Sequence, residues 1–93
     1  MSIQSFKCKN TENLFEGGKP KQFRNIETVA TRKLQMMDSA VELRDLRAPL
    51  GNRLEELSGN RAGQHSIRIN DQWRICFKFE NGHFLDVEIV DYH

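Results

Sequence analysis

Three strand-like runs separated by very short connections occupy the last third of the chain and restrict its fold most. They cover residues 65–70, 73–79 and 83–92, with Asn, Asp and Gly between them. One face of the middle run is apolar and consists of Trp73, Ile75, Phe77 and Phe79. The alternating face carries Arg74, Cys76 and Lys78. Because such short connections join antiparallel neighbours, we expect the chain to end in a mainly antiparallel sheet.

The connection between the second and third runs decides which residues face each other. A two-residue Asn81-Gly82 turn would place Phe77 opposite Asp86, beside a carboxylate. A three-residue loop over residues 80–82 keeps the rings among apolar side chains, so we expect its pairs, which are Phe77 with Leu85, Ile75 with Val87 and Trp73 with Ile89. The same reasoning across residues 70–72 pairs Ile69 with Trp73 and Ile67 with Ile75.

This register predicts two different faces of the sheet. Helices should cover the face made by Ile67, Ile69, Trp73, Ile75, Phe77, Leu85, Val87 and Ile89. The opposite face would carry Arg68, Arg74 and Glu88. Two facing guanidinium groups repel each other unless an anion lies near them. Glu88 or a phosphate is the expected anion, since the planar fork of arginine matches phosphate oxygens.

The first half is predicted to be mainly helical. Residues 2–8 are expected to form a short strand, and Asn10-Thr11 to cap a helix that residues 17–20 end through their glycines and proline. Residues 22–43 show helical spacing of apolar side chains, which are Ile26, Val29, Ala30, Leu34, Met37, Ala40 and Val41. Residues 44–52 should form a loop or a helical turn. Residues 52–57 are expected to form a further short strand.

Composition favours one domain over residues 1–93. A chain of 93 residues with 38% hydrophobic and 29% charged residues is typical of a small globular domain, and its apolar runs are too short to cross a membrane. We find no signal peptide, so the cytoplasm is the expected location. The two cysteines and three histidines lack the spacing of a metal site, and no cofactor is expected.

Charge is distributed unevenly along the chain. Residues 1–50 carry nine Lys and Arg against six Asp and Glu, whereas residues 51–93 carry five against seven. Four cations fall outside the apolar stripe of the long helix, and they are Lys21, Arg24, Arg32 and Lys33. They are expected to form a solvated face first and a nucleic-acid contact second.

The chain ends in Asp91-Tyr92-His93, directly after a strand-like run. An acid, a phenol and an imidazole can each move a proton or contact a phosphate, which is an unusual set for a terminus. Strict alternation places Tyr92 on the arginine face and the other two on the opposite face. A bulge or a departure from the sheet must therefore turn His93 toward the arginines.

The segments GNRAGQHSIRINDQWRICF at 59–77 and VEIVDYH at 87–93 resemble the HigB branch of the RelE/ParE superfamily of bacterial toxins. TENLF at 11–15 and LRDLR at 43–47 extend the resemblance to nearly the whole chain. It implies an α+β fold of order β-α-α-β-β-β-β, with two N-terminal helices packed on one face of the sheet. It also implies a type II toxin that is a metal-independent, ribosome-dependent endoribonuclease and inhibits translation.

The resemblance further implies a mechanism and partners. The ribose 2′-hydroxyl attacks the adjacent phosphorus of messenger RNA, in the decoding site of a ribosome that includes 16S rRNA. A HigA-like helix-turn-helix antitoxin neutralises the toxin, and operator DNA is contacted only through their complex.

This chemistry needs a base, an acid and cations for the phosphorane oxygens. Arg68 and Arg74 meet the need for cations, and His93 can serve as acid or base. Tyr92 can stack on a base or orient the 2′-hydroxyl, and Asp91 can hold the imidazole or bind an exocyclic amine.

Glu55 lies where some relatives have a histidine between two leucines. It can act as the base only if a dry site makes its carboxylate more basic. Arg53 and Arg61, with Lys21 and Arg24, are the candidates for phosphate binding, and the first two can equally serve to keep their loops soluble.

Two other functions share this fold. ParE-like relatives bind DNA gyrase and cut nothing, but they generally lack an acid and base set at the end of the sheet. The third reading is a partner that co-represses its operon together with the antitoxin, without strong nuclease activity.

Overall fold

The computed structural model describes residues 2–92 and contains an antiparallel sheet of four strands in the order β1-β2-β3-β4. The strands are β1 (Glu55–Glu56), β2 (His65–Arg68), β3 (Trp73–Glu80) and β4 (His83–Asp91). The helices are α1 (Lys9–Phe15) and α2 (Glu27–Ser39). Short 3-10 turns are η1 (Lys21–Ile26), η2 (Leu43–Arg47), η3 (Leu50–Asn52) and η4 (Gly59–Arg61).

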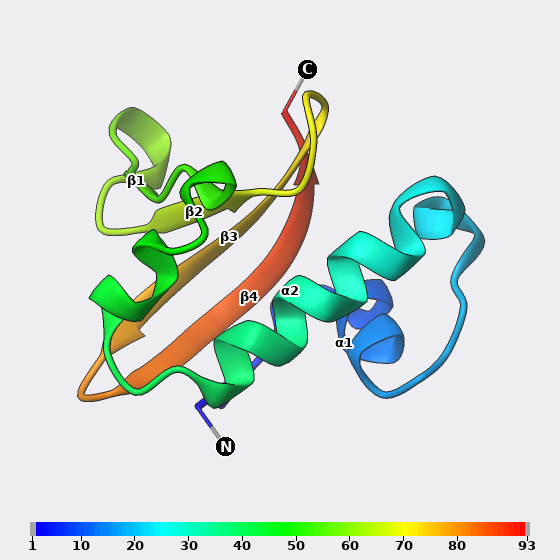
Figure 1. Ribbon diagram of the computed structural model, residues 1–93, viewed down its shortest axis with the longest axis horizontal. Coiled ribbons are helices and arrows are strands. Elements are labelled where there is room, and N and C mark those ends of the chain that lie inside the picture. The colour runs from blue at the N-terminus through cyan, green and yellow to red at the C-terminus, as the bar shows by residue number, and fades with distance from the viewer. Residues whose placement is uncertain (1, 93) are drawn as a thin grey trace.

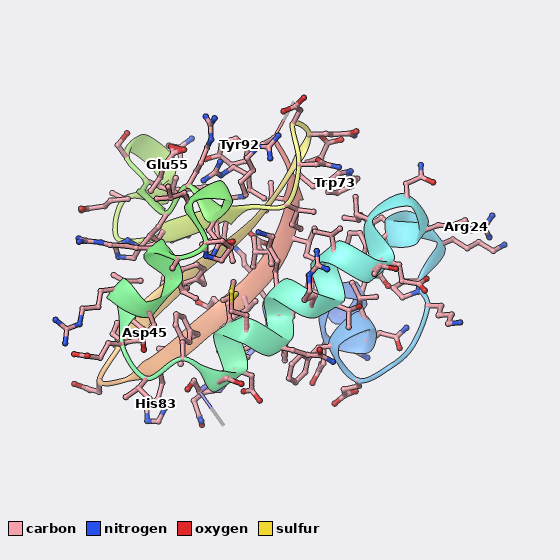
Figure 2. All side chains as sticks on the ribbon, in the orientation of Figure 1. Arg24, Asp45, Glu55, Trp73, His83 and Tyr92 are labelled. Carbon is pink, nitrogen blue, oxygen red and sulfur yellow. The ribbon has the colours of Figure 1, made fainter. Side chains whose placement is uncertain are left out.

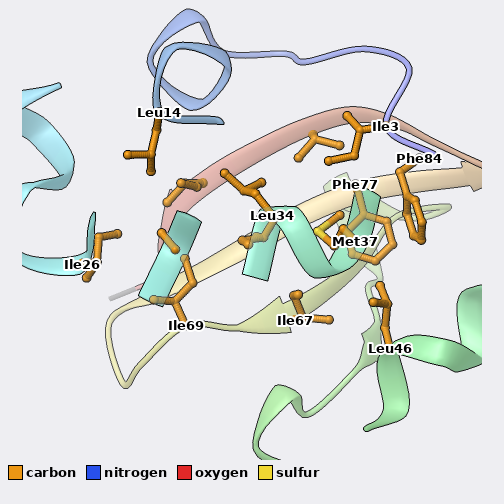
Figure 3. Packing of buried hydrophobic residues seen from close by; sticks show 14 of the residues in the cluster. Ile3, Leu14, Ile26, Leu34, Met37, Leu46, Ile67, Ile69, Phe77 and Phe84 are labelled. Atoms are coloured by element: carbon orange, nitrogen blue, oxygen red, sulfur yellow. The ribbon is translucent and has the colours of Figure 1, made fainter. Parts of the chain in front are cut away.

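One face of the sheet is covered by α2, which crosses in front of the long hairpin of β3 and β4 (Figure 1). The side chains of Leu34 and Met37 on α2 are fully buried between the helix and the strands (Figure 3). Burial of one such side chain contributes about 1.5 to 3 kcal/mol to stability. This α+β arrangement agrees with the predicted fold. Among residues 2–92, the helices are all too short or too polar to span a membrane.

The predicted register between β3 and β4 is wrong. The strands pair Glu80 with His83 across a two-residue Asn81-Gly82 turn, and both turn residues have positive φ angles. This is the combination that two-residue hairpin turns favour. Further along, Ile75 pairs with Ile89 and Trp73 pairs with Asp91.

A bulge in β4 explains why the two-residue turn is tolerated. Cys76 pairs with Glu88 and Lys78 pairs with Leu85, so two residues of β4 lie opposite Phe77 alone. Asp86 lies in the bulge with φ at 52°. The extra residue changes the side to which the following residues point, which returns Val87 and Ile89 to the core. The faces of β3 are therefore as predicted, although the pairs are shifted by two residues.

The bulge also changes one member of the core. Phe84, rather than the predicted Leu85, is fully buried, and its ring contacts Phe77 with centroids 5.2 Å apart. Leu85 lies opposite Lys78 on the other face. Across the other connection, the pair Ile67 and Ile75 is as predicted, and the amide of Ile69 donates to the carbonyl of Trp73 at 2.9 Å.

The helical half differs from the prediction at its ends. The long helix is interrupted, since η1 precedes α2 and Phe23 has non-helical backbone angles. Val41 is 71% exposed because α2 ends at Ser39 and Ala40 is extended. At α1 the cap is Cys8 rather than Asn10-Thr11. Thr11 is instead buried and accepts a hydrogen bond from the amide of Ile89 at 3.0 Å.

Residues 2–8 run beside β4 without forming a continuous strand. Ile3 and Phe6 make isolated parallel bridges to Phe84 and Val87. The amide of Gln4 donates to the carbonyl of Phe84 at 2.9 Å. The segment thereby covers part of an edge that would otherwise present unpaired backbone groups.

Candidate functional site

Arg74 is the most constrained charged residue on the face of the sheet opposite α2. It lies in β3 and is only 9% exposed. Its Nε donates to Oγ of Ser66 at 2.8 Å, and its Nη2 donates to the backbone carbonyl of Arg53 at 2.7 Å. A buried guanidinium must be paired or hydrogen bonded to be tolerated. These contacts hold the group in one orientation.

Two exposed side chains complete the surroundings of this guanidinium. Oε1 of Glu55 lies 3.3 Å from Nη2 of Arg74, and the side chain of Glu55 is 57% exposed. The ring of Tyr92 packs against the guanidinium, with its centroid 5.9 Å from Cζ. Glu55 and Tyr92 lie at the same end of the molecule (Figure 2). The structure therefore brings together three predicted site residues from β1, β3 and the end of the chain.

Arg68 lies directly opposite Arg74 in the register of β2 and β3, as predicted. Of the two anions expected beside this pair, Glu88 is wrong, and a phosphate stays a prediction. Glu88 forms an ion pair with Arg61 at 2.8 Å, while Arg68 contacts Asp71 and Arg74 contacts Glu55. The cause is the shifted register, which places Glu88 opposite Cys76 instead of Arg74.

The terminal residues are described as far as Tyr92. Its amide donates to the carbonyl of Gln72 at 2.7 Å, and its ring lies on the arginine face, as alternation predicts. Asp91 is opposite Trp73 and accepts a hydrogen bond from Nε2 of Gln72 at 3.1 Å. His93 lies outside the described residues, so its orientation toward the arginines stays a prediction.

The four candidate phosphate-binding residues lie in different places. Arg53 follows η3 and contacts Arg74 through its own carbonyl. Arg61 reaches Glu88 on β4, and this hydrogen bond raises the pKa of its guanidinium. Lys21 and Arg24 belong to η1, and Arg24 lies at the opposite end of the molecule from Glu55 and Tyr92 (Figure 2). The structure therefore does not bring Arg24 to the end of the molecule where Glu55 and Tyr92 lie.

Sequence reasoning missed Ser66 and the carbonyl of Arg53. Ser66 is fully buried, and its hydroxyl accepts from the guanidinium of Arg74. A signal was available, because Ser66 alternates with Ile67 and therefore shares the face of Arg68. The contribution of Arg53 had no such signal, since a backbone carbonyl can be supplied by any residue.

A further cation, Lys33 on α2, lies near Arg68. Burial lowers its pKa, and the charges of Arg32 and Arg68 lower it further. Its Nζ donates to Oδ1 of Asn52, which is fully buried. Lys33 is therefore held by Asn52 and lies near enough to Arg68 for the two positive charges to disfavour each other.

The other reactive side chains and surface hollows of residues 2–92 are weaker candidates for a functional site than the surroundings of Arg74. Cys76 is buried on the arginine face, and this burial raises the pKa of its thiol, which makes it a poor nucleophile. Within residues 2–92 there is no cluster of three or more His, Cys, Asp or Glu residues suited to a metal ion. A shallow hollow lies on α1, away from Arg74, and is lined by Lys9, Asn10, Glu12, Asn13 and Glu16.

Comparisons with known proteins agree on one family. Residues 4–93 match the family model described as a RelE-like toxin of the type II toxin-antitoxin system HigB. The chain is 42% identical over 79 residues to Toxin HigB-1 of Vibrio cholerae, covering 83% of each chain. It is 37% identical over 95 residues to Endoribonuclease HigB of Proteus vulgaris, covering 98% of this chain and 99% of that one.

Solved structures show the same fold at low sequence identity. YafQ from E. coli has a TM-score of 0.62 at 10% identity, covering 97% of this chain and 91% of the other. YoeB in a complex with YefM from Staphylococcus aureus has a TM-score of 0.62 at 17% identity, covering 100% and 99%.

Proposed function

The chain belongs to the family of RelE-like HigB toxins of type II toxin-antitoxin systems, and on this premise we propose that it is an endoribonuclease that cuts messenger RNA on the ribosome. The observation that carries this proposal is the assembly of Glu55 and Tyr92 around the anchored guanidinium of Arg74, with Arg68 opposite. The relative from Proteus vulgaris, which matches nearly the full length, is named an endoribonuclease.

The reaction proceeds by attack of a ribose 2′-oxygen on the adjacent phosphorus. A bond forms between the 2′-oxygen and phosphorus while the bond to the 5′-oxygen breaks, which leaves a 2′,3′-cyclic phosphate and a free 5′-hydroxyl. Glu55 accepts the proton of the 2′-hydroxyl, and His93 donates a proton to the departing 5′-oxygen. Arg74 and Arg68 stabilise the negative charge on the equatorial oxygens of the phosphorane.

Tyr92 and Asp91 have supporting roles in this proposal. Tyr92 is 44% exposed beside the guanidinium, so its ring is available to stack on an unstacked base or to orient the 2′-hydroxyl. Asp91, at the end of β4, orients the imidazole of His93 or binds an exocyclic amine of that base.

The openness of the site supports dependence on the ribosome. Glu55 is mostly exposed, whereas a carboxylate becomes an effective base when water is excluded from it. A second body that covers the site would supply these surroundings. We propose that the decoding site with messenger RNA and 16S rRNA is that body, and that Lys21, Arg24, Arg53 and Arg61 contact its phosphates.

Membership of a type II toxin-antitoxin family brings an antitoxin as a partner. We propose a HigA-like helix-turn-helix protein, through which the toxin contacts operator DNA, and a cytoplasmic location where translation takes place. YefM in the Staphylococcus aureus complex is an antitoxin bound to a chain of the same fold.

Translating ribosomes incubated with the purified chain test the proposal, with primer extension to map the ends of the message. We expect new 5′ ends for the natural chain and for His83→Ala, since His83 is exposed at the opposite end of β4 from Tyr92 (Figure 2). Tyr92→Ala should lower the yield of these ends at least 10-fold.

The same samples distinguish the alternatives. Absence of new ends together with inhibition of DNA supercoiling by gyrase would favour a ParE-like poison. Absence of both activities, with operator binding that the chain strengthens through the antitoxin, would favour a co-repressor. Either outcome contradicts the endoribonuclease.

A further inference from the structure

We propose that Ser66 and the backbone carbonyl of Arg53 are positioning groups, which hold Arg74 so that Nη1 remains the nitrogen that binds the reacting phosphate. The inference rests on the proposed function and adds to it. It concerns what makes one arginine of the facing pair different from the other.

The hydrogen bonds of Arg74 engage two of its three nitrogens. Nε donates to Oγ of Ser66 at 2.8 Å, and Nη2 donates to the carbonyl of Arg53 at 2.7 Å. Nη2 also faces Glu55 at 3.3 Å. Within residues 2–92, Nη1 makes no hydrogen bond or ion pair. The anchored group therefore keeps the two N–H donors of Nη1 for an anion.

The two anchors hold the guanidinium of Arg74 more firmly than the contact with Glu55 does. Ser66 is fully buried and Arg74 is 9% exposed, so their hydrogen bond is shielded from water. Glu55 is 57% exposed and lies at the longer distance. A carboxylate that is weakly held can leave the guanidinium and act on a proton, while the serine and the carbonyl keep the guanidinium in place.

The backbone of Arg53 supports a specific role for its carbonyl. Arg53 has φ at 44° and ψ at 59°, in the left-handed region that residues other than glycine rarely adopt. This conformation is unfavourable for a residue with a Cβ, because the Cβ crowds the carbonyl oxygen that follows it. It ends η3 at the point where the carbonyl meets Nη2 of Arg74. Strain of this kind, located at a contact of a site residue, is characteristic of functional sites.

Arg68 provides the comparison within the same pair. It lies opposite Arg74, but its guanidinium contacts Asp71, whose side chain is fully exposed in the turn after β2. An arginine with an exposed partner adapts its position to the RNA. Arg74 instead has a fixed orientation before the RNA arrives, and preorganised donors stabilise developing charge best.

Ser66→Ala removes one anchor and keeps every side chain that is proposed to contact RNA in the chain. We expect the rate of cutting on ribosomes to fall roughly 10-fold to 100-fold with little change in KM, because the guanidinium is misplaced rather than absent. Ser66→Thr keeps the hydroxyl and should restore most of the rate. Ser58→Ala is the matched control, since Ser58 precedes η4 and its side chain makes no cap hydrogen bond.

A direct readout of Arg74 separates positioning from stability. In ¹⁵N NMR spectra the Nε–H of Arg74 should give a sharp signal that exchanges slowly with water. The signal should broaden or exchange rapidly in Ser66→Ala and persist in Ser66→Thr and Ser58→Ala. If Ser66→Ala is unfolded at the assay temperature, Ser66→Cys replaces it, because a thiol of similar size is a weak acceptor and should give the same loss.

The results distinguish this inference from the proposed function. An unchanged Nε–H signal, or an unchanged rate, in folded Ser66→Ala would overturn the positioning role. Failure of the natural chain to cut RNA on ribosomes would overturn the proposed function, and the NMR signal would still show whether Ser66 holds Arg74.

Discussion

At the scale of single residues, the adjacent Glu55 and Glu56 of β1 allow a matched comparison of the two faces of the sheet. Both are exposed, and Glu55 pairs with Ser66 whereas Glu56 pairs with His65, so their side chains point to opposite faces of the sheet. Glu55 contacts Arg74. The two residues therefore have the same side chain, lie in the same strand and are both exposed, but only Glu55 is on the face that carries the candidate site.

We predict that Glu55→Gln slows cutting at least 100-fold, because an amide cannot accept the proton of the 2′-hydroxyl. Glu56→Gln should stay within about two-fold of the natural chain, since it is on the other face of the strand. Single-turnover cutting on programmed ribosomes measures both rates. Equal rates for the two variants would remove Glu55 from the mechanism.

The candidate site could be predicted from the sequence only in part. The facing of Arg68 and Arg74 follows from alternation and one short connection, and it is confirmed. The anion beside Arg74 depends on the register with β4, which a single bulge at Asp86 changes. No local pattern predicted that bulge, because Asp tolerates many turn and loop conformations.

At the scale of elements, the bulge in β4 decides which residues of the hairpin face the core. Asp86 has φ at 52°, and its carboxylate lies 3.5 Å from Nζ of Lys78 in an exposed ion pair. Such a pair contributes about 0 to 1 kcal/mol. The backbone conformation is therefore the larger constraint at this position.

We predict that Asp86→Ala is less stable than Asp86→Gly by about 1 kcal/mol, because both lose the ion pair and only alanine has a Cβ in the left-handed region. Denaturant unfolding of the two variants measures the difference. If alanine were equally stable, the bulge would not depend on the left-handed residue.

The turn η2 gives a prediction about pH. The carboxylate of Asp45 accepts hydrogen bonds from the amides of Glu42 at 2.9 Å and Val41 at 3.0 Å. These bonds lower the pKa of Asp45, that of Glu42 having the larger effect. A carboxyl group whose pKa is lower in the folded chain than in the unfolded chain stabilises the fold at pH values above its pKa in the unfolded chain. This contribution disappears as the pH falls through the pKa of the folded state.

We therefore predict that Asp45→Asn lowers the melting temperature at pH 7 and that its difference from the natural chain shrinks as the pH falls below about 4. Glu16→Gln is the control, an exposed carboxylate at the end of α1. Thermal unfolding between pH 2 and 7 follows both variants. A difference that stays constant over this range would show that charge on Asp45 is not the cause.

Element types were more predictable than element ends. The apolar spacing of Ile26, Ala30, Leu34 and Met37 correctly identifies a helix whose buried side faces the sheet. It does not show that Pro20 leads into a 3-10 turn or that the helix ends before Val41. Ends depend on a few hydrogen bonds whose energies nearly balance, whereas the buried face depends on many contacts that act together.

At the scale of the whole molecule, the residues that stabilise the fold and the residues proposed to carry the chemistry lie in different parts of the structure. The core lies between α2 and the sheet and contains Leu34, which is fully buried. Tyr92 is 44% exposed and lies at the end of the sheet beside Arg74. A chain of this length has a net stability of roughly 5 to 14 kcal/mol, so a single core substitution removes a large fraction of it.

We predict that removal of Tyr92 and His93 abolishes cutting on ribosomes while the melting temperature and antitoxin binding stay close to those of the natural chain. Among the contacts of residues 2–92, the deletion removes one backbone hydrogen bond, from the amide of Tyr92 to the carbonyl of Gln72, and no core side chain. Leu34→Ala should do the opposite, with a loss of about 2 to 5 kcal/mol in stability and a normal cutting rate per folded molecule. Calorimetry, antitoxin binding and ribosome assays on both variants give the comparison. A shortened chain that fails to fold would place the last two residues in the structural framework and remove the support for their role in catalysis.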